Sequence, residues 1–187
     1  LHELWNFRRE ELFGDNLKSS RFPLLMKILD SKDDLSIQVH PPAQIAPLLG
    51  GSPKTEMWYI ARALPGSKLY VGLREGITRG QFEEAIRSGS MENMIHSVEP
   101  RAGQSLFITS GRLHAIGAGM LIYEIQQNSD TTYRVFDWNR VGLDGRPRDL
   151  HVRESLASID FTDYEPSMDQ PEGQNLATCQ HFKVDFL

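Results

Sequence analysis

The stretch GQSLFITSGRLH, at residues 103–114, combines a strand pattern, a tight turn and a histidine. Residues 104–109 are apolar enough to form a strand, and residues 110–113 (SGRL) carry a turn signal directly after it. His114 follows this turn. Other short strand patterns bounded by turn signals lie on both sides of the stretch, and such a series is typical of a β-sandwich or β-barrel.

The surrounding sequence predicts more strands than helices. Apolar patterns predict strands at residues 22–29, 35–40, 54–64, 68–73, 104–109, 120–126, 132–138 and 182–186. Helical spacing predicts helices at residues 1–15 and 151–159 and shorter helical pieces near 43–53 and 91–95. Thr78 begins a further helix, because Gln81 follows at capping-box spacing and Gly89 suits its end. The predicted fold class is therefore mainly β, with a few short helices.

The composition is that of an ordinary globular protein. The chain has 187 residues, and its 25 acidic and 20 basic residues give a net charge of −5, which argues against a general nucleic-acid-binding protein. No apolar run approaches the ~20 residues of a membrane span. The single cysteine, Cys179, forms no intrachain disulfide or cysteine-based zinc site and favours a reducing, cytoplasmic location. Arg146, Arg148 and Arg153 form a small basic group that we expect to face solvent.

Polar side chains share one face of several predicted strands. Gln38 and His40 are two residues apart in one strand, so both side chains point to the same side. Lys54 and Glu56 share a face of the next strand, and His114 follows the turn described above. A lone histidine is more often a surface or core residue, but an inward polar row is costly unless it binds something. Two histidines, a glutamate and a glutamine indicate a divalent metal site, and the lack of thiolates favours a catalytic one.

Residues 103–114 resemble the second sequence motif of the cupin superfamily. That motif is a glycine, five residues, a position that is usually proline, any residue, a second glycine, two residues and a histidine. Thr109 stands at the proline position, and this difference removes no ligand. The resemblance implies a double-stranded β-helix, or jelly-roll barrel, with His114 directed into it. A cupin fold alone specifies no function, because the fold supports many.

Further segments narrow the resemblance to one family. In chain order they are LSIQVHPP (35–42), PKTEMWY (53–59), SGRLHAIGAG (110–119), EIQQNSDTTYRVFDWNR (124–140) and RDLHVRESL (148–156). Together they resemble the type I mannose-6-phosphate isomerases, most closely the short bacterial branch, over residues 1–187. The resemblance implies an isomerase that interconverts mannose 6-phosphate and fructose 6-phosphate through an enediol, with one Zn²⁺ per chain.

The resemblance also implies roles for individual residues. The implied zinc ligands are Gln38, His40, Glu56 and His114. The implied catalytic residues are Arg134, Lys54, Glu124 and His151, of which the last three are unranked candidates for moving protons. The implied substrate-binding residues are Ser36, Lys54 and Arg134, with Ser36 associated with the substrate phosphate. His151 falls where longer members of the family carry an aspartate implicated in opening the sugar ring.

Two alternatives remain open from the sequence. One is another metal-cupin enzyme, such as an oxygenase that binds iron through the same ligands. The segments KTE (54–56) and NSDTTYR (128–134) argue against it, because redox chemistry at iron has no evident need for that lysine and arginine. The other is a non-catalytic sugar-phosphate-binding metal cupin, which only an activity assay separates from the isomerase.

The chain divides at a polar stretch near its end. Residues 1–165 are expected to form the metal-binding cupin domain, with an N-terminal helix and a helical insertion near 78–96. Residues 167–175 contain a proline and a glycine among polar residues, which is typical of a linker. Residues 166–187 are therefore expected to form a linker and the first strand of a truncated second cupin domain. No nucleic-acid or membrane partner is expected, and the sequence leaves the oligomeric state open.

Overall fold

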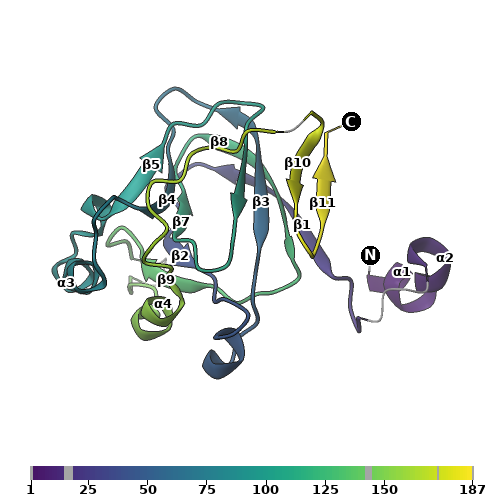
Figure 1. Ribbon diagram of the computed structural model, residues 1–187, viewed down its shortest axis with the longest axis horizontal. Helices are drawn as coiled ribbons and strands as arrows, with labels where there is room; N and C mark the ends of the chain where they lie inside the picture. The colour runs from purple at the N-terminus through teal and green to yellow at the C-terminus, as the bar shows by residue number, and fades with distance from the viewer. Residues whose placement is uncertain (1, 15–18, 142–144, 172, 187) are drawn as a thin grey trace.

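The computed structural model describes residues 2–14, 19–141, 145–171 and 173–186. Residues 1 and 15 of the predicted N-terminal helix, and residues 172 and 187 of the predicted C-terminal segment, lie outside the described residues. The fold is mainly β, as the strand patterns predict (Figure 1). Every helix among the described residues is too short or too polar to cross a membrane.

The strands and helices follow the predicted order with some differences in their bounds. The strands are β1 (Leu24–Ser31), β2 (Ile37–Val39), β3 (Glu56–Ala63), β4 (Leu69–Leu73), β5 (Ile95–Val98), β6 (Ser105–Ile108), β7 (His114–Ile116), β8 (Met120–Gln127), β9 (Tyr133–Phe136), β10 (Asn175–Thr178) and β11 (Lys183–Asp185). The α-helices are α1 (His2–Phe7), α2 (Arg9–Phe13), α3 (Arg79–Ser88) and α4 (Val152–Ser158). Two short 3-10 helices are η1 (Ala46–Leu49) and η2 (Met91–Asn93).

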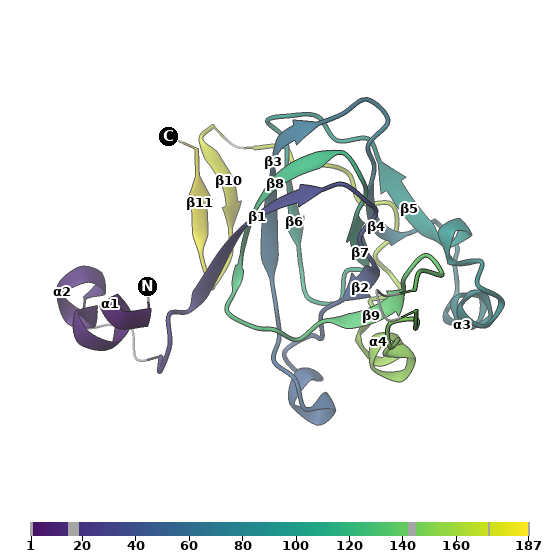
Figure 2. The ribbon, with the colours of Figure 1, turned by 180° about the vertical axis from the view of Figure 1, so that it is seen from behind.

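Two antiparallel sheets face each other and form the barrel (Figures 1 and 2). The first has the strand order β1-β8-β3-β6 and the second the order β5-β4-β7-β2-β9. Strands that are distant in the sequence are neighbours in both sheets, as in the pairs β1–β8 and β2–β7. This arrangement is the cupin barrel that the motif at residues 103–114 implies.

The outer face of the five-stranded sheet is apolar, and the residue of β2 that points inward is polar. Ile37 and Val39 alternate with Gln38 along β2, and both are fully buried in a cluster with Phe82 of α3 and Ile159 beyond α4. The helices therefore cover the outer face of this sheet, and Gln38 points to the other side. The capping box predicted for Thr78 and Gln81 is confirmed at the start of α3.

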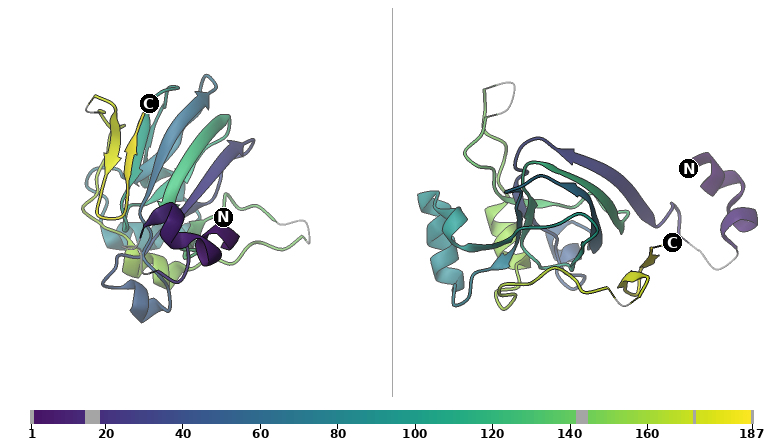
Figure 3. Two further views of the ribbon diagram at one scale, coloured as in Figure 1. Left: turned by 90° about the vertical axis from the view of Figure 1, so that its right-hand side faces the viewer. Right: turned by 90° about the horizontal axis from the view of Figure 1, so that it is seen from above.

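A second apolar cluster fills the barrel between the two sheets. Trp58 and Ile60 of β3, Val71 of β4 and Leu106 of β6 are all fully buried in it. The hairpin of β10 and β11 lies beside the four-stranded sheet (Figure 3). Its Phe182 packs beside Met57 on the outer face of β3, whereas Met26 and Ile28 of β1 are exposed. The hairpin therefore packs on the side of the four-stranded sheet that faces away from the barrel interior.

Several predicted elements differ from those observed. The N-terminal helix is two short helices, α1 and α2, and its aromatic residues Trp5 and Phe13 pack at a ring-centroid distance of 5.4 Å. The predicted strand at 54–64 begins only at Glu56, so Lys54 lies before it. The sequence patterns missed β5, β7 and β10, each of which is three or four residues long.

Candidate metal centre

Strand register brings the predicted ligands together. Gln38 of β2 pairs with His114 of β7 and, on its other side, with Arg134 of β9. Side chains directly opposite each other in an antiparallel pair point to the same face of the sheet. Glu56 opens β3 in the facing sheet. The centre therefore lies between the two sheets, at the end of the barrel where β2 ends.

His40, Glu56 and His114 form a compact and fully buried group. One candidate ligand atom from each of the three lies within 4.8 Å of the others. The His40 Nε2 atom is 3.3 Å from Glu56 Oε2, and the His114 Nε2 atom is 3.5 Å from Glu56 Oε1. The Gln38 amide joins this group, because its Nε2 atom lies 3.3 Å from His114 Nε2. All four predicted metal ligands therefore lie in one place.

The other ring nitrogen of each histidine is held by a backbone carbonyl. His40 Nδ1 is 3.0 Å from the Thr131 oxygen, and His114 Nδ1 is 2.8 Å from the Arg112 oxygen. A carbonyl only accepts hydrogen bonds, so each Nδ1 atom donates and each Nε2 atom presents a lone pair. Metal-binding histidines are oriented in this way by their second nitrogen.

Unpartnered buried atoms in the centre fit a cation. His40 Nε2 and both carboxylate oxygens of Glu56 are buried and make no well-formed hydrogen bond, although the two side chains lie at ion-pair distance. A buried carboxylate without hydrogen bonds carries a large desolvation cost. A divalent cation between these atoms would remove that cost, and imidazole nitrogen with carboxylate oxygen suits zinc.

The charges of the centre favour its metal-binding protonation states. Burial raises the pKa of Glu56, but the neighbouring His40, His114 and Lys54 outweigh it and hold that pKa well below its ordinary value. Burial and the nearby His40 lower the pKa of His114 to about 3, although Glu56 opposes the shift. Glu56 is therefore ionised and His114 neutral at neutral pH, as metal ligation requires.

Lys54 and Glu124 lie in one polar network beside the metal-binding group. The Lys54 Nζ atom is 3.1 Å from Glu56 Oε2 and donates to Gln126 Oε1 at 3.2 Å. Lys27 of β1 donates to the same Gln126 oxygen at 2.5 Å and to Glu124 Oε1 at 2.8 Å. Trp58 Nε1 donates to Glu124 Oε2 at 3.1 Å. The network therefore leads from the metal ligand Glu56 to the carboxylate of Glu124.

Arg134 lies on β9 of the five-stranded sheet and is held by the segment before α4. Its Nη1 atom donates to the Asp149 oxygen at 2.9 Å, and its backbone N–H donates to His151 Nδ1 at 3.2 Å. Its Nε atom is buried and has no hydrogen-bond partner among the described residues. Burial and the charge of Arg148 lower the pKa of Arg134 from its ordinary value.

The remaining predicted site residues, Ser36 and His151, lie next to β2 and at the start of α4. Ser36 is 7% exposed and directly precedes β2, two residues before Gln38. His151 stands at the start of α4, and its ring lies 6.0 Å from that of Tyr133. Because His151 Nδ1 accepts from Arg134, its proton lies on Nε2.

Comparisons with known proteins agree with this geometry. The family model described as phosphomannose isomerase type I, catalytic domain, matches residues 1–56. The mannose-6-phosphate isomerase ManA of Bacillus subtilis is 40% identical over 193 residues, which cover 98% of this chain and 60% of that protein. The mannose-6-phosphate isomerase of Streptococcus mutans is 43% identical over 157 residues, with 83% and 49% covered.

The chain is similar to type I phosphomannose isomerases along almost its whole length. A solved structure of the Bacillus subtilis mannose 6-phosphate isomerase superposes with a TM-score of 0.83 at 33% identity and covers 97% of this chain and 60% of that one. The chain thus spans about half to three fifths of the length of the relatives it matches. The family resemblance stated from the motifs is therefore confirmed, and the fold is the cupin barrel of this phosphomannose isomerase family.

Three residues of the candidate site were missed in the sequence. Lys27 carries the only charge in the apolar run FPLLMKIL at 22–29, and a lone charge in a buried strand is a usable signal. Gln126 lies two residues after Glu124 on the same face of β8, so strand alternation could have found it. The Thr131 carbonyl that orients His40 has no signal in the residue type, because any residue supplies a carbonyl.

Proposed function

We propose that this chain carries the active site of a zinc-dependent mannose-6-phosphate isomerase. The observation that carries the proposal is the buried group of His40, Glu56 and His114, in which His40 Nε2 and both Glu56 carboxylate oxygens have no hydrogen-bond partner among the described residues. Lys54 and Arg134 bring two cationic groups near it, as recognition of an anionic sugar phosphate requires. The family relationship supports the same reaction, the interconversion of mannose 6-phosphate and fructose 6-phosphate.

His40, Glu56, His114 and Gln38 would hold one Zn²⁺ ion. Zinc, when bound, supplies a Lewis acid for the sugar oxygens at C1 and C2. The protein keeps these ligands dry and oriented, because the carbonyls of Arg112 and Thr131 fix the two imidazole rings.

The isomerisation moves a proton between C2 and C1 of the open sugar through an enediol. We propose Glu124 as the base, because its carboxylate is buried and held in place by Lys27 and Trp58. Lys54 would donate hydrogen bonds to the sugar oxygens beside the metal ligands. The ring must open before the proton moves, and His151 would assist that step through its Nε2–H.

Arg134 would stabilise the negative charge that develops on the enediol oxygens. Its buried Nε–H has no hydrogen-bond partner among the described residues, and a bound substrate oxygen would supply one. Ser36 precedes Gln38 in the chain at the same wall, and we propose that its hydroxyl binds the substrate phosphate.

The wider setting is also a proposal. We propose that residues 1–165 form the metal-binding domain and that residues 166–187 form a linker and the first strand of a second domain. The packing of β10 and β11 on the outer face of the four-stranded sheet, away from the metal ligands, supports this division. The proposed substrate is a metabolite, which supports a cytoplasmic enzyme of carbohydrate metabolism.

The test is a coupled assay for conversion of mannose 6-phosphate to fructose 6-phosphate, with bound metal quantified in the same sample. We expect turnover and about one zinc ion per chain in the full-length protein. Iron in place of zinc would favour another metal-cupin enzyme. Zinc loading without turnover would favour a non-catalytic sugar-phosphate-binding protein and overturn the proposal.

A further inference from the structure

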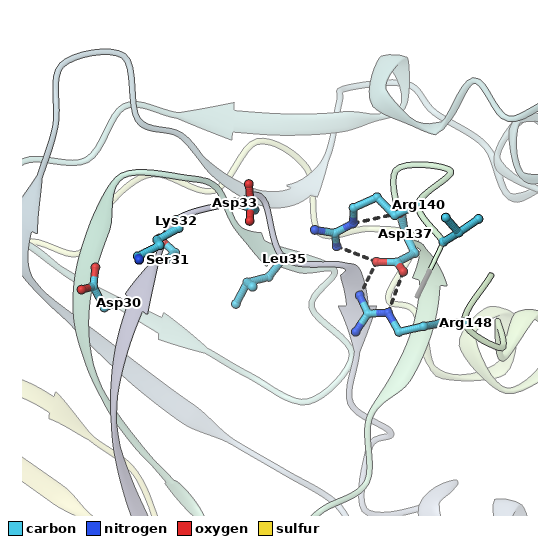
Figure 4. Close-up of a pocket in the computed structure, with 9 residues that line it drawn as sticks. Asp30, Ser31, Lys32, Asp33, Leu35, Asp137, Arg140 and Arg148 are labelled. Atoms are coloured by element: carbon cyan, nitrogen blue, oxygen red, sulfur yellow. Dashed lines mark hydrogen bonds and ion pairs between the residues drawn. The ribbon is translucent and has the colours of Figure 1, made fainter. Parts of the chain in front are cut away.

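Asp137 is a buried carboxylate at the end of β9, three residues after Arg134. Its side chain is 7% exposed and accepts hydrogen bonds from two arginines (Figure 4). Arg148 binds it through two nitrogens: Nε donates to Oδ2 at 2.6 Å and Nη2 donates to Oδ1. Arg140 Nη2 also donates to Oδ1, at 2.6 Å. A bidentate arginine fixes direction as well as distance, so this pair sets the position of residue 148.

The backbone directly after Asp137 adopts an uncommon conformation. Trp138 and Asn139 follow with φ of 55° and 53°, in the left-handed region that non-glycine residues seldom occupy. The turn is anchored by Trp138, whose Nε1 donates to the Leu35 oxygen at 2.8 Å and whose ring lies 5.0 Å from that of Tyr70. Backbone strain of this kind persists where the surrounding contacts impose it, and it recurs at functional sites.

The segment that Asp137 fixes is the one that holds Arg134. Asp149 directly follows Arg148, and its carbonyl accepts from Arg134 Nη1 at 2.9 Å. Two residues further on, the His151 N–H donates to the Arg134 oxygen at 2.8 Å, and His151 Nδ1 accepts from the Arg134 N–H. The path from Asp137 to the Arg134 guanidinium therefore runs through one bidentate ion pair, one peptide unit and one hydrogen bond.

We propose that Asp137 is a positioning residue that fixes the guanidinium of Arg134 by binding Arg148. This inference rests on the proposed function, in which Arg134 stabilises the charge of the enediol oxygens. A displacement of about 1 Å in such a group reduces turnover strongly, because the donor no longer meets the developing charge. Arg148, expected from the sequence to face solvent, is instead half exposed and bound to Asp137.

A different role for Arg148 predicts a different kinetic result. Asp137, Arg140 and Arg148 line a groove of about 470 Å³ together with residues 30–33 and Leu35 (Figure 4). If Arg148 contacted the substrate there, its loss would raise KM. If it acts by positioning Arg134, its loss lowers kcat and changes KM little.

The experiment compares Asp137→Asn and Arg148→Gln in the full-length, zinc-loaded enzyme. Both should lower kcat by roughly 10-fold or more with KM changed less than threefold. In an Arg134→Lys background, Asp137→Asn should lower kcat no further, since the residue it positions is already lost. Glu83→Gln is the matched control, because this substitution also removes a carboxylate that is bound to an arginine, here Arg79 on α3. This variant should leave both kcat and KM unchanged.

A second readout does not depend on turnover. In arginine-labelled protein, Asp137→Asn should shift or broaden the NMR signal of the Arg134 Nε–H, which Arg134→Lys assigns. The inference is overturned if the Arg134 signal is unchanged or if kcat stays within threefold of wild type. It is also overturned if only KM rises, by tenfold, or if Asp137→Asn lowers kcat equally in the Arg134→Lys background. If Asp137→Asn does not fold, Arg148→Gln is judged by the same outcomes. Lack of turnover in the wild-type enzyme would instead overturn the proposed function.

Discussion

His40 and His114 present the nitrogens that can bind a metal because their other nitrogens are occupied. Each Nδ1 atom donates to a backbone carbonyl, which leaves both Nε2 atoms directed at Glu56. The carboxylate between them is fully buried and lacks well-formed hydrogen bonds. The centre is therefore organised before a metal arrives, and its electrostatic cost falls when one binds.

Replacement of Glu56 by glutamine tests the charge of this centre. Glu56→Gln keeps the size of the side chain but removes the negative charge that faces His40, His114 and Lys54. We expect zinc affinity to fall by at least 10-fold, as measured by competition with a chromogenic chelator. The control Glu83→Gln changes an exposed helical pair and should bind zinc as tightly as wild type. Equal zinc affinity in the two variants would show that Glu56 is no ligand.

Replacement of Arg134 by lysine tests the proposed stabilisation of the enediol charge. Arg134→Lys keeps a cation but lacks the Nε–H donor that has no hydrogen-bond partner among the described residues. We expect kcat to fall by roughly 100-fold, the size of effect seen when one preorganised donor is removed. Steady-state kinetics with mannose 6-phosphate measure it, and near-full turnover would refute the assignment.

Strand alternation made the candidate metal ligands predictable from the sequence. Residues that depend on strand pairing or on backbone contacts could not be predicted in this way. Gln38 and His40 follow from a period of two, and Glu56 follows from the next polar row. Lys27 approaches Glu124 only because β1 pairs with β8, a contact between residues 97 positions apart. Asp137 acts through the backbone of a distant segment, which no local pattern encodes.

At the scale of elements, the segment of residues 160–168, here called the strap, is hydrogen-bonded to β4. Residues 160–168 run along β4, where Leu73 donates to the Asp163 oxygen at 2.9 Å and Glu165 donates to the Leu73 oxygen at 2.9 Å. Gly72 permits this close approach. A Cβ atom there would lie 2.5 Å from Pro166 Cδ and 2.8 Å from the Asp163 oxygen, and its φ is +66°.

Replacement of Gly72 by alanine should therefore destabilise the barrel. We expect Gly72→Ala to lower the free energy of unfolding by about 2 kcal/mol more than Gly76→Ala, because both sites have positive φ but only Gly72 also meets close neighbours. For a chain of this size that difference lowers Tm by roughly 4–8 °C. Equal Tm values for the two variants would mean that the strap moves aside without cost.

Long elements were predicted better than short ones, for a physical reason. The eight residues of β8 repeat their burial pattern often enough to define a strand, and α3 has its capping box. β7 has only three residues, too few for a repeating burial pattern. All three are buried because β4 and β2 pair with β7 on its two sides. Such strands are specified by their partners and not by their own sequence.

At the scale of the whole molecule, stability should depend on pH through the metal centre. The pKa of His114 is about 3 in the folded protein, and its ordinary value is 6.5. Between these values the unfolded chain binds a proton that the folded chain excludes, so stability is full above about pH 6.5 and is lost as the pH falls. The lowered pKa of Glu56 acts in the same direction below about pH 4.5.

Thermal unfolding should show this dependence. We expect Tm to fall progressively as the pH is lowered from 7 to 5, because the unfolded chain gains a proton on His114 that the folded chain excludes. His96, on β5 outside the metal centre, provides the control: His96→Gln should leave the pH profile unchanged. A Tm that rises as the pH falls through this range would contradict the assignment of a neutral, buried His114.

The central claim is that the group of His40, Glu56 and His114 holds the zinc ion of a sugar-phosphate isomerase. The most direct measurement is mannose 6-phosphate turnover by the full-length protein as purified, after removal of metal with a chelator and after zinc is restored. We expect turnover to be lost with the metal and to recover in proportion to bound zinc, up to one ion per chain. Turnover that persists without metal, or a zinc-loaded protein that converts no mannose 6-phosphate, would contradict it.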